Sequence, residues 1–298
     1  MYITKLNAND NRYYVKYDYM NEEQKPTIKA IAPSVTTAIG TIKNKELELI
    51  INIKGKAFLN RAAERGTIIH NIIDEIIKEN KIGINKNLLN YYFSDNNFND
   101  KTENNELTNK LYSILTHPIF LEDNSNVVSE KTLFNDIDGR KIAGTMDYYN
   151  KETNVLIDWK SGAIPALNFH YKMQLAIYAH LTKLEYDLAE YPITKIVCPK
   201  NHKNRKTLAH SEFILDNAEV PKLIEQFKVI YDVAEWNTQI NNDLLKKKYL
   251  DTDYVEFDKI AETPKTKVSE IDLLIDSLEV IRWQYNKHKA KKKNLETR

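Results

Sequence analysis

The chain has 298 residues, of which 42% are hydrophobic and 29% are charged, a composition typical of globular proteins. Its formal net charge of +1 means that any basic surface for nucleic acid must be local. A single cysteine, Cys198, excludes a disulfide framework. The chain contains no long apolar run and does not begin with a signal-peptide pattern, so we expect a cytoplasmic protein without a transmembrane helix.

The first 31 residues predict a small, strand-rich segment, in which Tyr13–Tyr17 forms an edge strand or a hairpin arm. A helix is predicted to begin near Ser34, with Ser34 or Thr36 as its N-cap. The alternative is that Ser34, Thr36 or Thr37 contacts a phosphate group.

A longer helix is predicted over Lys56–Lys81, because isoleucines recur along one face, and we expect it to be interrupted near Gly66. His70 follows Gly66 by four residues and lies off the centre of the apolar stripe. Taken alone, His70 is a partly buried histidine that hydrogen-bonds Asp74 one turn on. Arg65 is either a phosphate contact or a solvated helix residue.

Residues 83–126 are rich in Asn and Lys with scattered aromatic residues. We interpret this segment as a helical insertion that contains a short helix over Leu107–Leu115. It could form part of a wall for a nucleic-acid strand, but the composition favours a solvated cap.

A three-stranded meander followed by a helix is the most informative part of the chain. Asp138-Gly139 predicts a tight hairpin turn, because such turns require a positive φ. The strands are rich in β-branched and aromatic residues, and the helix shows apolar steps of three and four residues. The predicted strands are Val127–Phe134, Lys141–Tyr149 and Val155–Lys160, and the helix runs from about Phe169 to Leu184.

Two carboxylates and a lysine occur at the ends of the second and third of these strands. Alternation along a strand places Asp158 and Lys160 on one face and Trp159 on the other. Asp147 faces Asp158 only if the register of the two strands allows it, and the sequence does not determine that register. Two close carboxylates are costly to bury without a cation, so a divalent metal is the simplest solution.

These motifs together resemble the PD-(D/E)XK nuclease superfamily, in particular its RecB-like branch. The segment from Pro33 to Thr37 also resembles the entry segment of phage exonucleases and of the mitochondrial genome maintenance exonuclease. The resemblance covers roughly Ala32 to Tyr178, with the elements in the family's order. The motifs are Gly66-x-x-x-His70, Gly144-x-x-Asp147, Asp158-x-Lys160 and Gln174-x-x-x-Tyr178.

The resemblance implies an α/β fold with a restriction-endonuclease-like core, in which helices flank a mixed central β-sheet. From the order of the elements we expect a nuclease domain over residues 1–240, and an amphipathic helix and a run of lysines predict a C-terminal helical extension with a basic tail over 241–298. After the meander we expect further strands at Ile193–Pro199, parallel or mixed with the others, and at Ala209–Leu215. A helix is expected over Val220–Ile240.

The implied activity is metal-dependent hydrolysis of DNA by an exonuclease that acts on DNA ends or single strands. Recombination, repair or phage DNA processing would be its setting, in a bacterial or phage-infected cell, with recombination or replication proteins as further partners. Competing interpretations are an inactive DNA-binding accessory protein with this fold, a duplex-cutting endonuclease, and a generic carboxylate metal-binding module.

The resemblance also assigns roles to individual residues. Mg²⁺ or Mn²⁺ would be held by His70, Asp147, Asp158 and the carbonyl of Trp159, and Lys160 would stabilise the transition state. Glu130 would act near the metal, the alternative being an exposed strand residue paired with Lys131 or Lys141. Gln174 and Tyr178 would orient the site or the DNA. The predicted DNA contacts are Ser34, Thr36, Arg65, Ser161, Lys203, Arg205 and Lys206. The last three belong to a basic loop over Lys200–Lys206, for which the alternative is a solvated surface loop. An iron–sulfur cluster is not expected, because one thiolate cannot hold it.

Overall fold

The structure is a computed structural model that describes residues 2–8, 11–18, 27–40, 53–79, 101–121, 125–164, 166–200 and 208–234. Its strands are β1 (Tyr2–Ala8), β2 (Asn11–Asp18), β3 (Thr27–Pro33), β4 (Val127–Ile137), β5 (Arg140–Asn150), β6 (Val155–Trp159), β7 (Ile193–Pro199) and β8 (His210–Ile214). Its helices are α1 (Val35–Ile39), α3 (Lys56–Lys78), α5 (Lys101–Ile114), α6 (Phe169–Glu185) and α7 (Val220–Val233), with short 3₁₀ turns at Pro118–Leu121 and Asn217–Glu219. The predicted basic loop with Lys203, Arg205 and Lys206, and the extension over 241–298, lie outside the described residues.

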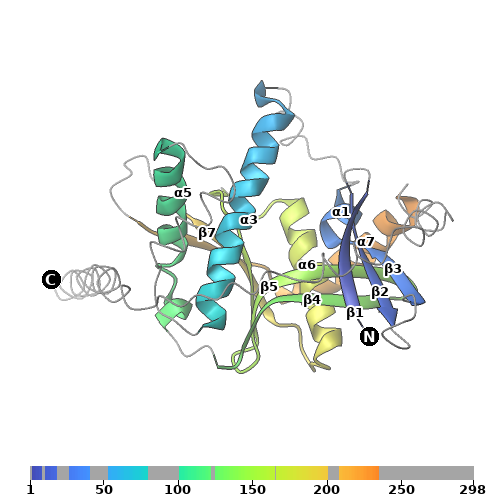
Figure 1. Ribbon diagram of the computed structural model, residues 1–298. Coiled ribbons are helices and arrows are strands. Elements are labelled where there is room, and N and C mark those ends of the chain that lie inside the picture. Colours follow the sequence, from blue (N-terminus) through green and yellow to red (C-terminus); the bar gives the residue numbers. More distant parts are fainter. Residues whose placement is uncertain are drawn as a thin grey trace.

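The central sheet has five strands in the order β4-β5-β6-β7-β8 (Figure 1). The β6–β7 pair is parallel, and the other neighbouring strands are antiparallel. The β4–β5 hairpin turns at Asp138 and Gly139, whose φ angles are 51° and 82°, as the sequence predicted. The α/β fold with a mixed central sheet is therefore confirmed.

Helices cover both faces of the central sheet (Figure 1). One core joins α1, α6 and α7 to residues such as Met146 and Leu156, while the other joins α3 and α5 to Ile157 and Trp159. Residues that alternate along β6 thus enter opposite cores, as expected for a strand buried on both sides. The end of β6 is therefore enclosed between α3 and α6.

The insertion before the meander is not the solvated cap that its composition suggested. Within its described part, Leu107, Leu111 and Ile114 of α5 are buried against the isoleucines of α3. Phe120 stacks on the Trp159 ring with 5.5 Å between centroids. The steps of four and three residues in α5 mark a buried helix face, which the surrounding Asn and Lys residues obscured.

Helix α3 also differs from its prediction, because it runs without a break through Gly66. A glycine inside a helix costs only about 1 kcal/mol relative to alanine, whereas α3 buries six isoleucines on one side. Burial of that face therefore outweighs the local preference. Helix α7 is shorter than predicted, since Val233 ends it and Ala234 is extended.

The N-terminal segment forms a separate antiparallel sheet of three strands in the order β1-β2-β3, which agrees with the predicted strand-rich start. A bridge between Ser34 and Ala143 connects its end to β5. Among the described helices, none combines the length and apolar character that a bilayer crossing requires.

Candidate active site

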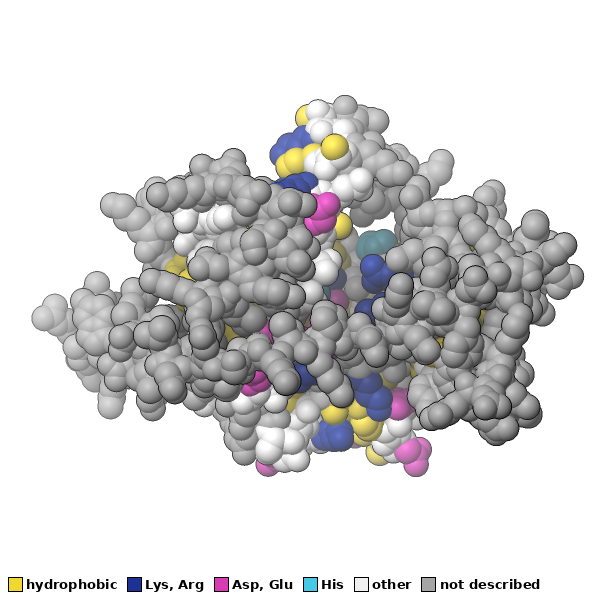
Figure 2. All heavy atoms as spheres, in the orientation of Figure 1, with side chains coloured by type: hydrophobic (Ala, Val, Ile, Leu, Met, Phe, Trp, Pro, Cys, Tyr) yellow, Lys and Arg dark blue, Asp and Glu magenta, His cyan; other side chains and the backbone are white. Residues whose placement is uncertain are grey.

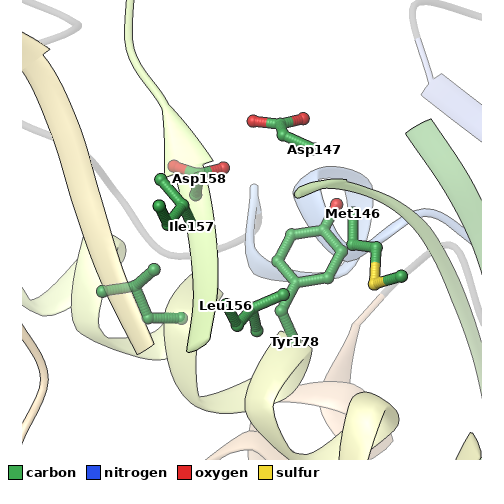
Figure 3. Close-up of a pocket in the computed structure, with 7 residues that line it drawn as sticks. Met146, Asp147, Leu156, Ile157, Asp158 and Tyr178 are labelled. Carbon is green, nitrogen blue, oxygen red and sulfur yellow. The ribbon is translucent and has the colours of Figure 1, made fainter. Parts of the chain in front are cut away.

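The register of β5 and β6 brings the two carboxylates of the site together. Tyr148 pairs with Ile157 in this antiparallel ladder, so Asp147 lies next to the end of β6. Its Oδ2 accepts a hydrogen bond of 2.8 Å from the backbone N–H of Trp159. Figure 3 shows the carboxylates of Asp147 and Asp158 on the same side, above the ring of Tyr178.

His70 approaches these strands from α3, one turn after Gly66. Its Nδ1 lies 3.2 Å from Asp147 Oδ1 and 3.8 Å from Glu130 Oε1. These three side chains each offer a ligand atom, and the atoms all lie within 4.8 Å of one another. Asp74, the alternative partner of His70, instead pairs with Lys78 at 2.7 Å and accepts a hydrogen bond from Ser129. The interpretation of His70 as a partner of Asp74 is therefore wrong.

Glu130 reaches the site through a distortion of β4. Its φ is 47°, a left-handed conformation that is uncommon for a residue with a side chain. The β4–β5 ladder pairs Ser129 with Tyr148 and Lys131 with Met146, but it skips the position between them. Such backbone strain often marks functional sites. The left-handed position carries neither glycine nor asparagine, the residues that would indicate it in the sequence, so only the structure reveals this conformation.

The alternative role of Glu130, an exposed residue paired with a neighbouring lysine, does not fit the structure. Lys131 pairs with Glu185 at 2.7 Å. Glu130 instead lies beside His70, with about a quarter of each side chain exposed.

The electrostatics of this cluster favour a cation. Burial alone would lower the pKa of His70, but Asp147 and Glu130 outweigh it and raise the pKa to about 10. Burial would raise the pKa of Asp147, but His70 outweighs burial and lowers it. The carboxylates thus hold a proton on the imidazole. A divalent cation on the same donors would replace that proton, because a ligating histidine is neutral, so the donor set fits a metal.

A second set of contacts surrounds Lys160, just after β6. Its Nζ lies 2.6 Å from Asp158 Oδ2 and donates to Gln174 Oε1 at 3.2 Å. Gln174 Nε2 in turn donates to Asp158 Oδ1 at 3.3 Å. Burial would lower the pKa of Lys160, but Asp158 and Asp147 raise it overall. Lys160 is therefore a fixed positive charge, and Asp158 faces it instead of His70.

Tyr178 forms the floor of the site and explains Gly144. A methyl group at Gly144 would lie 2.8 Å from Tyr178 Cε1 and 2.9 Å from Val35 Cγ2, closer than real side chains allow. The Tyr178 ring therefore packs directly on the backbone of β5, below Asp147, and it lines a narrow pocket with Met146 (Figure 3). Gly144 is required for this approach rather than for a turn.

Replacing Gly144 with alanine is expected to destabilise the protein by roughly 1–3 kcal/mol, because the added methyl overpacks a closed site. Gly66→Ala is the matched control. At Gly66 the methyl would meet only Ser161 Oγ at 3.5 Å, an ordinary contact, and alanine favours a helix. Urea unfolding measures both variants. Equal unfolding midpoints for Gly144→Ala and wild type would contradict the proposed contact.

The two predicted phosphate contacts at the start of α1, Ser34 and Thr36, differ from each other in burial. Ser34 is buried and caps the helix, since its Oγ accepts the Thr37 N–H at 3.1 Å and donates to Thr37 Oγ1 at 3.0 Å. Its hydroxyl thus fills the capping role. Thr36 is exposed, with its Oγ1 2.9 Å from Ser34 Oγ.

Two further candidates lie on the α3 side. Ser161 is next to Gly66, directly after Lys160. Arg65 points back along α3, where its guanidinium lies 6.0 Å from the centre of the Phe58 ring and its Nε donates to the Arg61 carbonyl at 3.3 Å.

Sequence reasoning missed a second polar cluster, formed by His117, His210 and Glu212. Glu212 Oε1 lies 3.2 Å from His117 Nε2 and 3.4 Å from His210 Nε2, and its Oε2 is 2.9 Å from Lys195 Nζ. Burial lowers the pKa of His117 to about 4. The Ile119 N–H donates to His117 Nδ1 at 3.3 Å, which leaves the proton of the neutral ring on Nε2. These three side chains each offer a possible ligand atom, and the atoms all lie within 4.8 Å of one another.

Comparisons with known proteins add little to this picture. No protein-family model and no curated protein matches the sequence. The crystal structure of a protein designated SSO0001 is 18% identical, with an alignment that covers 57% of this chain and 90% of that chain at a TM-score of 0.25. A likeness at this level carries no argument about function.

Proposed function

We propose that this protein is a metal-dependent nuclease that hydrolyses phosphodiester bonds in DNA. The observation that carries the proposal is the convergence of His70, Glu130 and Asp147 from three different elements, beside the partly buried charge of Lys160. The choice of DNA, and of ends or single strands, rests on the family resemblance of the motifs.

The donor types favour Mg²⁺ or Mn²⁺. Carboxylate oxygens suit Mg²⁺, and an imidazole beside them also suits Mn²⁺. His70, Glu130 and Asp147 would hold the ion. Asp158 and the carbonyl of Trp159 remain further proposed ligands, since the Asp158 carboxylate lies beside that of Asp147 (Figure 3). An ion of this kind lowers the pKa of a bound water and neutralises charge on a phosphate.

The remaining residues have separate roles. Lys160 would act as a positive charge that stabilises the phosphoryl oxygens in the transition state. Gln174 positions Lys160 and Asp158 through its two hydrogen bonds. Tyr178 supports β5 from below. A generic metal-binding module does not require a partly buried lysine at this position, so Lys160 favours an enzyme.

The test is an incubation of purified protein with single- and double-stranded DNA, labelled at either end, in Mg²⁺, Mn²⁺ or EDTA. We expect metal-dependent cleavage that EDTA abolishes. An Asp147→Asn protein prepared in the same way controls for contaminating nucleases. Cleavage from labelled ends separates an exonuclease from a duplex-cutting endonuclease. If the folded wild-type protein binds DNA but cuts no substrate with either metal, the enzyme proposal fails and the accessory-protein alternative replaces it.

A further inference from the structure

One face of the N-terminal sheet carries basic residues next to the active site. Lys5 on β1 pairs across the strands with Tyr14 on β2, and residues that pair in this way present their side chains on the same face. Arg12 precedes Tyr14 by two residues, so alternation puts it on that face as well. Lys5 and Arg12 are both exposed.

Tyr14 determines where this face lies. Its hydroxyl is 2.9 Å from Thr145 Oγ1 on β5, two residues before Asp147, and its ring packs with Ala32 and Ala143. The basic face is therefore held against the strand that carries a proposed metal ligand.

The direction of β2 places Arg12 and Lys16, two basic residues of this face, at different distances from the active site. Lys16 follows Tyr14 and lies over the Phe134 ring at 5.4 Å, and Phe134 pairs with Ala143, on the side of Thr145 away from Asp147. Arg12 precedes Tyr14 and so lies toward the Asp147 side. Lys16 thus shares the face of Arg12 but points away from the site.

The charges of this face and of the site act on each other. Although Lys5 reaches solvent, the protein around its ammonium group removes enough water to lower the pKa of Lys5 overall. The negative charges of Glu130 and Asp147 act in the opposite direction, and the positive charge of Arg12 lowers this pKa further. Figure 2 shows Lys and Arg side chains and a histidine in the hollow at the centre of this view, below the upper end of α3. The charges of Glu130 and Asp147 therefore reach Lys5, although the whole chain has a net charge of only +1.

We propose that Lys5 and Arg12 bind the phosphate backbone of a DNA strand and position it over the active site. The N-terminal sheet would then form one wall of the DNA-binding cleft. Lysine and arginine side chains are the usual partners of backbone phosphates, and such contacts fix the position of the strand on the protein. This inference rests on the proposed nuclease function, which it extends to residues outside the recognised motifs.

The experiment measures binding separately from cleavage. Fluorescence anisotropy with a labelled single-stranded oligodeoxynucleotide in EDTA gives affinity at several salt concentrations for wild type, Lys5→Gln/Arg12→Gln and Lys16→Gln. The double variant is expected to bind roughly tenfold more weakly, with its salt slope reduced by about 0.7 for each lost phosphate contact. The Lys16→Gln control is expected to match wild type. In cleavage assays the double variant should raise KM more than it lowers kcat.

Lys5→Arg/Arg12→Lys retains both charges and should restore most of the affinity. Unchanged affinity and salt slope in the double Gln variant would overturn the inference, even if wild type cleaves DNA. Weaker binding that the Lys16→Gln variant shows equally would overturn it too, since a general loss of charge would then explain the effect. If wild type binds DNA and cuts none, the nuclease proposal fails, but the same salt slopes still decide whether this face contacts DNA.

Discussion

Asp147→Asn is expected to cleave DNA roughly a thousandfold more slowly than wild type at equal metal concentration. Loss of a charged metal ligand removes several kcal/mol of transition-state stabilisation. Asp147 contacts His70 directly and accepts the Trp159 N–H, so it connects α3, β5 and β6. The amide nearly matches the carboxylate in shape, so we expect the fold to remain intact. Single-turnover cleavage and a Mn²⁺ binding titration measure the two effects.

Asp74→Asn is the matched control for this variant. Asp74 lies one turn after His70 on the same helix, yet it bonds Ser129 and Lys78 rather than the cluster. Its variant should cleave at nearly the wild-type rate. Wild-type cleavage by Asp147→Asn across the Mn²⁺ titration would rule out the proposed metal centre.

Loss of the Lys160 charge is expected to lower the single-turnover rate by roughly a hundredfold or more at saturating metal. The ammonium adds nothing to metal binding, because like charges repel, so its benefit arises in the transition state. Lys160→Gln is the preferred variant, because it leaves a hydrogen-bond donor for the buried Asp158. Lys160→Ala would remove the ion-pair partner of that carboxylate and leave it with the hydrogen bond from Gln174, which destabilises the fold. DNA and metal binding should stay near wild type in both variants.

Two further variants sharpen this test. Lys160→Arg should restore only part of the rate, since the guanidinium is wider than an ammonium and holds its partners differently. Lys172→Gln is the control. Lys172 lies on α6, as Gln174 does, but its Nζ pairs with the Glu219 carboxylate at 2.7 Å and not with the site. If Lys160→Gln and Lys160→Ala, both folded by circular dichroism, cleave as fast as wild type, Lys160 has no catalytic role.

Local patterns were sufficient to predict the elements of the core. Alternation predicted the strands of the meander and the shared side of Asp158 and Lys160, and the positive φ of Asp138 and Gly139 agrees with the predicted turn. The spacing of Gln174 and Tyr178 placed both on one face of α6. These features depend on residues that are close in the sequence, so the periodicity of the sequence is sufficient to predict them.

Composition and single residues were weaker guides. The Asn and Lys content around α5 hid a buried helix face, and Gly66 suggested a break in α3 that burial of the isoleucines prevents. In both segments, packing against the rest of the protein contributes more free energy than local propensity does.

The sequence by itself determined the α/β order of elements, the hairpin, and which residues of each strand and helix share a face. Only the tertiary structure decided the register that places Asp147 beside β6, the left-handed turn of Glu130 toward His70, and the contact of Tyr14, the partner of Lys5, with β5. The physical reason is the range of the interactions. Periodicity reports on neighbours along the chain, whereas these contacts join distant segments and depend on how two cores and two sheets pack together.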